Sequence, residues 1–301
     1  MPEDSPLPAT ESFDPRYRDL DAWPVESALL ALWEAQLAAV AAVRPALPAI
    51  AAAVHDVVKR LRDGGRLVYA GAGSSGRIAA QDAAELPPTF DWPRERTVLL
   101  LAGGAAALSV AVEGAEDDAA AARAAVAAHG IGAADAVVGV AASGGTQFTC
   151  ACLEEARARG ALTVAVAGSA GSRLLAVAAH PILVATGAEP IAGSTRMKAG
   201  TAQKVVLNLV STLAMVQLGR VHAGRMVDMH ASNAKLRARG VRMLRELTGA
   251  DEAAARAALA DAGGSVKLAV LRLHGLDAAA AQDLLARCGG QLRAALREIG
   301  R

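Results

Sequence analysis

The chain has 301 residues, and its 31 Lys and Arg side chains nearly balance its 30 Asp and Glu, which leaves a net charge of +1. This balance argues against a protein that binds the phosphate backbone of nucleic acids and against a polybasic membrane-surface protein. Hydrophobic residues make up 53% of the chain and charged residues 20%, which is typical of a globular protein and not of a disordered one.

The sequence predicts a cytoplasmic protein without a bound metal or cofactor. Its first residues are polar and acidic and lack the apolar core of a signal peptide. The longest uncharged stretches, such as residues 97–112, are broken by Gly pairs, so we expect no segment that spans a membrane. Three cysteines make neither a disulfide framework nor a four-ligand zinc site, and Cys150 and Cys152 are expected to pack in the core.

The first part of the chain predicts an extended arm, then two helices, and then strands that alternate with helices. Residues 1–23 are rich in Pro and acidic side chains and predict an extended arm. Residues 25–61 repeat Ala and Leu at helical spacing, with a break at Pro45 and Pro48, and predict two helices. Five short apolar runs follow, and we expect strands beginning at Arg66, Thr97, Ala136, Leu162 and Pro181.

Ala-rich helical stretches separate these runs, at residues 77–86, 105–112, 119–129 and 147–159. Continuous apolar strands separated by helices indicate a parallel sheet covered on both faces. From residue 194 onward no strand is expected, only helices at 199–219 and 228–247 and a set of short helices broken at glycines. We therefore predict an α/β fold, with a helical N-terminal segment at 1–51, a parallel-sheet α/β sandwich at 52–220 and a small helical C-terminal region at 221–301.

Two turns rich in glycine and hydroxyls follow predicted strands. Residues 71–76 read GAGSSG, which matches the GxGxxG pattern of dinucleotide folds. Such a fold also needs an acid at the end of the second strand, where this chain has Gly103 and Gly104. The third strand ends in SGGT at residues 143–146. Two such turns at the carboxyl ends of parallel strands favour a site for one compact phosphate over two merely tight turns.

Three carboxylates and one basic turn are candidates for chemistry at this phosphate. Glu85 precedes Pro87-Pro88, where the helix is expected to end, and Glu113 and Glu116 follow the second strand–helix unit. Each acid alone is typical of a solvated surface, whereas a pair beside a bound sugar would do acid–base work. Residues 193–204 read GSTRMKAGTAQK, which is either a solvated helix start capped by Ser194 or Thr195, or a second wall of an anionic-ligand site.

Four segments give the chain a family resemblance. They are GAGSSGRIAAQDAAELPPTF at residues 71–90, AVEGAEDD at 111–118, VVGVAASGGT at 137–146 and GAEPIAGSTRMKAGTAQKVVLNLVSTLAM at 187–215. With them the chain resembles the N-acetylmuramic acid 6-phosphate etherases, which carry a sugar isomerase (SIS) domain. The likeness extends over nearly the whole chain, and the ELPPTF, EGAED and GSTRMKAGTAQK segments are more specific than the glycine loop.

This resemblance implies an SIS-type fold and a lyase that works without a metal or cofactor. Such enzymes cleave the D-lactyl ether of N-acetylmuramic acid 6-phosphate by elimination and water addition, giving N-acetylglucosamine 6-phosphate and D-lactate. The family's catalytic glutamates fall on Glu85, expected to protonate the leaving lactate, and on Glu116, the partner base. The substrate-binding residues implied are Gly73, Ser74, Ser75, Ser143 and Thr146 around the 6-phosphate, and Ser194, Thr195 and Lys198 along the sugar.

The resemblance also implies a homodimer with sites near its interface, and a role in cell-wall amino sugar recycling. Glucokinase regulatory proteins are similar in the same segments, so a sugar-phosphate-binding regulator without catalysis is the alternative. A phosphosugar isomerase would use one carboxylate beside C2, but the two-glutamate pattern argues against it, and a dehydrogenase lacks the ribose acid. The chain departs from the family pattern at Ser74, at Gly145 and at residues 91–93, which concerns substrate fit more than the carboxylates.

Overall fold

The computed structural model describes residues 9–229 and 234–301 of the chain. Its contacts form two compact units. Unit 1 comprises the chain up to Ala84 together with Glu95–Ser211, and unit 2 comprises Glu85–Arg94 together with Thr212–Arg301. Of the three boundaries, those after Ala84 and Ser211 fall inside helices, and the one after Arg94 falls in a 3-10 turn. The three-part division expected from the sequence stays a prediction.

The N-terminal part of unit 1 contains the two expected helices. Three short 3-10 turns at Ala9–Glu11, Pro15–Tyr17 and Leu20–Ala22 occupy the arm, so the arm is less extended than predicted. Helix α1 (Val25–Ala41) and helix α2 (Leu47–Arg62) are separated by a 3-10 turn at Arg44–Ala46, because Pro45 and Pro48 remove backbone donors there. Helix α1 buries only Ala35 and Ala39, whereas one whole face of α2 is buried.

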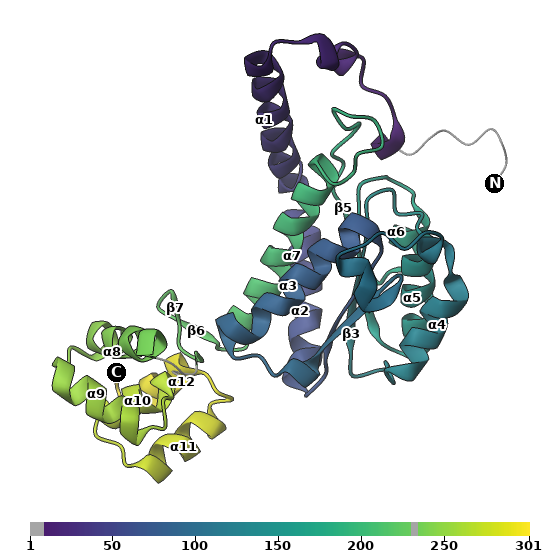
Figure 1. The fold of residues 1–301 in the computed structure, drawn as a ribbon. Coiled ribbons are helices and arrows are strands. Elements are labelled where there is room, and N and C mark those ends of the chain that lie inside the picture. Colours follow the sequence, from purple (N-terminus) through teal and green to yellow (C-terminus); the bar gives the residue numbers. More distant parts are fainter. Residues whose placement is uncertain (1–8, 230–233) are drawn as a thin grey trace. The chain divides into compact units, whose positions relative to one another are not determined.

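Five parallel strands form the sheet of unit 1 in the order β2-β1-β3-β4-β5. Figure 1 shows the sheet among its helices, with β3 and β5 labelled. They are β1 (Leu67–Gly71), β2 (Thr97–Leu101), β3 (Ala136–Ala141), β4 (Leu162–Ala167) and β5 (His180–Leu183). Every residue of the three central strands is buried, which explains their continuous apolar sequences. The five predicted strands and their parallel arrangement are confirmed.

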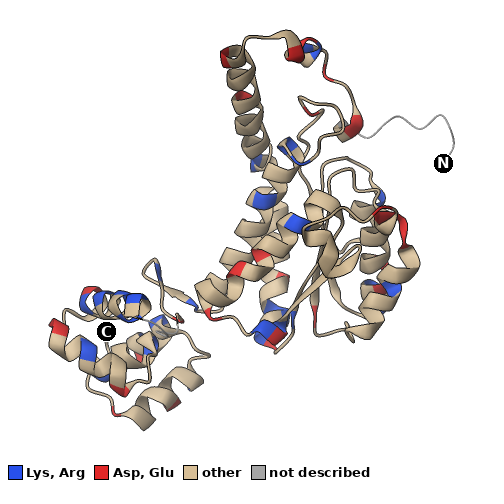
Figure 2. Ribbon diagram, viewed as in Figure 1, with Lys and Arg blue, Asp and Glu red and all other residues tan. Residues whose placement is uncertain are grey.

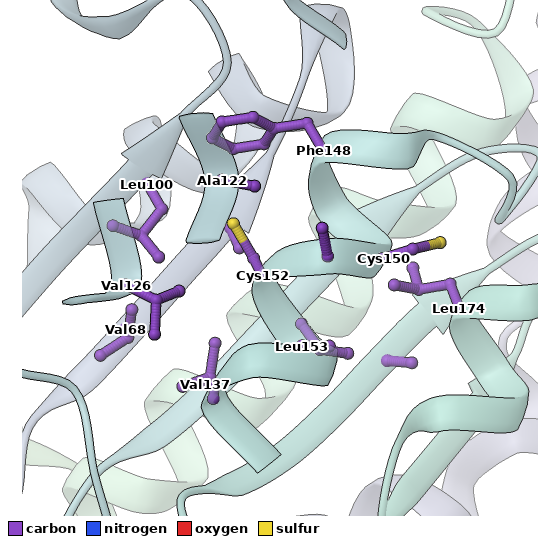
Figure 3. Packing of buried hydrophobic residues seen from close by; sticks show 14 of the residues in the cluster. Val68, Leu100, Ala122, Val126, Val137, Phe148, Cys150, Cys152, Leu153 and Leu174 are labelled. Carbon is purple, nitrogen blue, oxygen red and sulfur yellow. The ribbon is translucent and has the colours of Figure 1, made fainter. Parts of the chain in front are cut away.

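One face of the sheet is covered by α4 (Ala119–Ala128), α5 (Gln147–Ala158) and α6 (Arg173–Val177). Figure 3 shows Val68, Leu100 and Val137 of the strands packed against side chains of these helices. Cys150 and Cys152 are fully buried in this layer, and burial raises the pKa of their thiols to about 11 and about 12. Both cysteines are packing residues, as expected.

On the other face, α3 (Gly73–Phe90) and α7 (Lys198–Gln217) meet around one buried carboxylate. Asp82 on α3 accepts a 2.7 Å hydrogen bond from the Tyr69 hydroxyl of β1. It also accepts hydrogen bonds from Asn208 Nδ2 (2.6 Å) and Ser211 Oγ (3.2 Å) of α7. Since hydrogen bonds to an ionised group are stronger than neutral ones, Asp82 fixes α3 between the sheet and α7.

Helix α3 differs from its prediction at both ends. It begins at Gly73 rather than Arg77 and continues through Pro87 and Pro88 to Phe90, so the prediction that it ends before the prolines is wrong. Proline's fixed φ is compatible with a helix, and the cost is mainly the lost donors. The carbonyls at this helix end are satisfied, because Arg220 Nη1 donates to Phe90 O (2.9 Å) and Asp91 O (2.8 Å).

The helix expected at residues 105–112 is also wrong. That segment holds only a 3-10 turn at Gly104–Leu108, and a second one lies at Ala115–Asp117. Gly103 and Gly114 precede these turns with φ of 79° and 70°, in the left-handed region that favours glycine. The two glycines flank the predicted helix, and within it only the residues up to Leu108 form a turn, so the Ala-rich sequence does not form an α-helix here.

Unit 2 is a small helical bundle with one hairpin. The strands β6 (Val221–His222) and β7 (Arg225–Met226) pair around Ala223 and Gly224, which both have positive φ, although no strand was expected there. Helix α8 (Ala234–Thr248) begins later than predicted, because Asp228 and Met229 at the expected start are not helical and residues 230–233 lie outside the described part. It carries five Lys and Arg residues, and Figure 2 shows them in blue along this helix. The expected short helices follow as α9 (Glu252–Asp261), α10 (Val266–Leu273), α11 (Ala278–Arg287) and α12 (Leu292–Glu298).

Two helical stretches are long and apolar enough to cross a membrane, contrary to the prediction from uncharged runs. They are Val25–Arg62 and Lys198–Gln217. The most apolar window of the second stretch is 56% buried inside the protein, as in a core helix. The first stretch is divided by the 3-10 turn at Arg44–Ala46, and much of its apolar surface belongs to α1.

Candidate functional site

The carboxyl ends of β1 and β3 lie side by side, since Gly71 pairs with Val140 in the parallel register. Helix α3 starts directly after β1, so Ser74 and Ser75 belong to its first turn. A Cβ on Gly71 would lie 2.9 Å from Gly76 Cα, which explains the glycine at this close approach. The first turn of α3 therefore offers unpaired backbone N–H groups and two hydroxyls at the sheet edge.

The turn after β3 brings a second helix start to the same edge. Gly144 has a φ of 72°, and Ser143 Oγ accepts a hydrogen bond from Gly145 N at 3.2 Å. Thr146 occupies the N-cap position of α5 without a hydrogen bond from its side chain to the helix. Ser143 and Thr146 thus flank a helix N-terminus whose partial positive charge favours an anion.

A pocket of about 290 Å³ adjoins the start of α3 in unit 1. It brings together four residues that the sequence singled out, Gly73, Ser74, Glu113 and Glu116, and it adds Arg77. The other lining residues are small or apolar: Ala72, Ala102, Ala107, Ala111, Val112, Gly114 and Ala115. Ser75, Ser143 and Thr146 lie on the neighbouring turns rather than in the lining of this pocket.

Local backbone structure and one hydrogen bond position Glu116 and Arg77 in this pocket. Glu116 lies in the 3-10 turn Ala115–Asp117, and the next residue, Asp118, accepts a 2.8 Å hydrogen bond from Ala121 N and caps α4. Arg77 Nε donates to the Ala107 carbonyl at 2.8 Å. The sequence reasoning missed Arg77, although its position four residues after Gly73 puts both on one face of α3.

The GSTRMK turn is organised by a residue that the sequence reasoning also missed. Glu189 is fully buried, and its carboxylate accepts hydrogen bonds from Lys198 N (2.8 Å) and Ala199 N (2.9 Å), the first N–H groups of α7. The prediction that Ser194 or Thr195 caps this helix is therefore wrong. Ser194 and Thr195 lie half-buried in the preceding loop.

Lys198 is also part of this arrangement. Its Nζ donates to the Ala188 carbonyl at 2.8 Å, and burial lowers the pKa of its ammonium group. In the structure its positive charge is thus directed at the loop, and contact of Lys198, Ser194 and Thr195 with substrate stays a prediction.

Glu85 lies on the exposed side of α3, three residues after the buried Asp82, and belongs to unit 2. Glu116 is also exposed, in the pocket of unit 1. Within residues 9–229 and 234–301, no group of three or more His, Cys, Asp and Glu is arranged to hold a metal ion. Solvated carboxylates, helix N-termini, small hydroxyls and the guanidinium of Arg77 are the polar groups available here for chemistry on an anionic ligand.

Comparisons with known proteins identify relatives of this chain. The sequence model of the glucokinase regulatory protein N-terminal SIS domain matches residues 49–157. The chain is 50% identical over 264 residues to the N-acetylmuramic acid 6-phosphate etherase of Deinococcus radiodurans, covering 88% of this chain and 87% of the relative. It is 53% identical over 232 residues to the protein of the same name from Symbiobacterium thermophilum, covering 77% of each.

Among solved structures, a Bacteroides fragilis NCTC 9343 protein assigned as a phosphosugar isomerase matches with a TM-score of 0.50. It is 20% identical to this chain, and the match covers 67% of this chain and 99% of the other. This likeness concerns the fold alone, and it confirms the predicted SIS-type parallel sheet.

Proposed function

Since the chain belongs to the N-acetylmuramic acid 6-phosphate etherase family, we propose that it cleaves the D-lactyl ether at C3 of N-acetylmuramic acid 6-phosphate, giving N-acetylglucosamine 6-phosphate and D-lactate. The observation that carries this proposal is the pocket at the start of α3, which joins Ser74 of the glycine loop to Glu116. An anion-binding helix start next to a solvated carboxylate is the combination that acid–base chemistry on a phosphorylated sugar needs.

The 6-phosphate is proposed to bind between the N-termini of α3 and α5. Both helix starts direct backbone N–H groups and partial positive charge at the shared sheet edge. The hydroxyls of Ser74, Ser75, Ser143 and Thr146 surround the same edge and would donate to the phosphate oxygens. A phosphate held there leaves the sugar ring to extend into the pocket.

The reaction proceeds by elimination and then addition. In the open-chain sugar the C1 aldehyde acidifies the C2 proton, which Glu116 removes as the base. The C3–O bond breaks, and Glu85, assigned from the family resemblance, protonates the lactyl oxygen as it leaves. Water then adds at C3 of the unsaturated aldehyde and C2 regains a proton, so the product keeps a hydroxyl at C3.

The regulator alternative is not favoured, because the relatives that define the family are named as etherases. We further propose that the enzyme works in the cytoplasm, on amino sugars released from peptidoglycan. The proposed reaction needs no metal, because the carboxylates of Glu85 and Glu116 supply both proton transfers.

We also propose a homodimer, and the surface of α1 supports it. Val25, Leu29, Leu30, Trp33 and Leu37 on this helix are each at least half exposed. Figure 2 shows that the ribbon of α1 carries few charged residues. An apolar helix face of this kind, exposed in a single chain, is the usual sign of a surface covered by another subunit.

The test is incubation of the purified protein with N-acetylmuramic acid 6-phosphate, followed by an enzymatic assay of D-lactate. The proposal expects D-lactate and N-acetylglucosamine 6-phosphate in equal amounts from the wild type. The Glu116→Gln variant should release D-lactate about 10²–10⁴-fold more slowly while it still binds substrate. Tight binding without any turnover by the wild type would instead support the regulator.

A further inference from the structure

Arg77 is the one cation among the residues that line the pocket beside Ser74. It lies on α3 one turn after Gly73, and its Nε donates to the Ala107 carbonyl at 2.8 Å. This bond fixes the guanidinium plane through one of its three nitrogens. Arg77 takes part in none of the ion pairs between described residues, although Glu113 and Glu116 line the same pocket.

The charges of the pocket create a problem for the proposed substrate. N-acetylmuramic acid 6-phosphate carries two anionic groups, the phosphate at C6 and the carboxylate of the lactyl ether at C3. The phosphate has its partners at the helix N-termini. The lactyl carboxylate, however, lies close to the bonds that break at C2 and C3, where Glu116 acts as the base, and like charges at this range repel each other.

Among protein side chains, a guanidinium is the most suitable partner for the lactyl carboxylate, because it offsets this repulsion. Its planar fork matches both oxygens of a carboxylate and stays charged at every physiological pH. Arg77 has two terminal nitrogens beyond the one that donates to Ala107, and Arg77 lines the same pocket as the base. No other lining residue of this pocket carries a positive charge.

We propose that Arg77 binds the lactyl carboxylate of the substrate and so selects the lactyl ether over sugar phosphates that lack it. This inference rests on the proposed function, since the lactyl group is what the reaction removes. It makes Arg77 a specificity-determining residue. Arg77 would also release the product sugar readily, because N-acetylglucosamine 6-phosphate has no carboxylate for it to hold.

The test compares two ligands that differ only in the lactyl group. Calorimetry measures the binding of N-acetylglucosamine 6-phosphate to the wild type and to Arg77→Gln, and the same protein samples give KM and kcat for N-acetylmuramic acid 6-phosphate. We expect Arg77→Gln to raise KM for the lactyl ether about 10- to 100-fold, because the variant loses a charge-assisted hydrogen bond to the substrate. Its affinity for N-acetylglucosamine 6-phosphate should stay at the wild-type value.

Two further variants sharpen the result. Arg77→Lys keeps the charge but not the fork, so its KM should lie between those of the wild type and Arg77→Gln. Arg123→Gln, on the exposed surface of α4 and outside the pocket, is the matched control and should change neither ligand.

Equal loss of affinity for both ligands in Arg77→Gln, or no loss for either, would overturn the proposal. If the wild type has no turnover, the proposed function fails, and direct binding of the two ligands still tests Arg77. Equal affinities of the wild type and Arg77→Gln for N-acetylmuramic acid 6-phosphate would then refute the role of Arg77, whatever the activity assay shows.

Discussion

Replacement of Glu189 tests whether its carboxylate holds the GSTRMK turn at the start of α7. Its buried carboxylate accepts two backbone N–H groups at the start of α7, at 2.8 and 2.9 Å. Glu189→Ala leaves both donors buried without this partner and removes the negative charge nearest to the buried Lys198. Breaking a buried charged arrangement of this kind costs about 3 kcal/mol.

Unit 1, which contains Glu189, has 201 residues, and for a unit of this size a loss of about 3 kcal/mol lowers the melting temperature by about 6–12 °C. Differential scanning calorimetry or circular dichroism measures this shift. Glu154→Gln is the matched control, because its ion pair with Arg173 lies on the surface and is worth at most about 1 kcal/mol. Glu189→Gln should fall between the two, since its amide keeps only one acceptor oxygen. A melting temperature of Glu189→Ala equal to that of the control would refute the capping role.

Three further predictions concern acid stability, phosphate binding and assembly. Burial acts to raise the pKa of Asp135, but its hydrogen bonds with Arg66 and Gly132 outweigh this, and the pKa is lowered. Its stabilisation is therefore complete above the unfolded-state pKa of about 3.9 and lost as the pH falls through the folded value, so Asp135→Asn should destabilise in urea titrations at pH 7 more than at pH 3. Ser75→Ala should weaken sugar-phosphate binding about 10-fold in calorimetry, and equal weakening for the unphosphorylated sugar would contradict a phosphate contact. Trp33→Glu should convert the dimer to monomers in light scattering, and a wild type that is already monomeric would exclude the proposed interface.

The sheet could be predicted from the sequence because its three central strands are continuous apolar runs that both faces of the fold bury. The course of α3 could not be predicted in the same way. At its end the Phe90 carbonyl accepts a hydrogen bond from Arg220, which lies 130 residues away in the sequence, and local patterns do not reveal such a contact. The β6–β7 hairpin was missed because Ala223 adopts a positive φ that alanine rarely takes.

In the candidate site, too, local sequence motifs predicted some of the residues, whereas contacts between residues distant in the sequence determine the others. Motifs directed attention to Ser74 and Glu116, and the pocket contains both. The Glu189 cap escaped sequence reasoning because the hydroxyls of Ser194 and Thr195 are the stronger local capping signal. Arg77 escaped because only the fold brings the Ala107 carbonyl to its Nε. The catalytic roles of Glu85 and Glu116 rest on the family resemblance and stay predictions.

Isotope transfer from solvent tests the central claim most directly. The enzyme is incubated with N-acetylmuramic acid 6-phosphate in deuterated water, and in parallel in water enriched in oxygen-18, and both products are analysed by mass spectrometry and NMR. Elimination and addition predict deuterium at C2 of N-acetylglucosamine 6-phosphate and oxygen-18 at C3 of the sugar, with none in the D-lactate ether oxygen. Oxygen-18 in the lactate together with an unlabelled C2 would mean displacement at the lactyl carbon and would contradict the account.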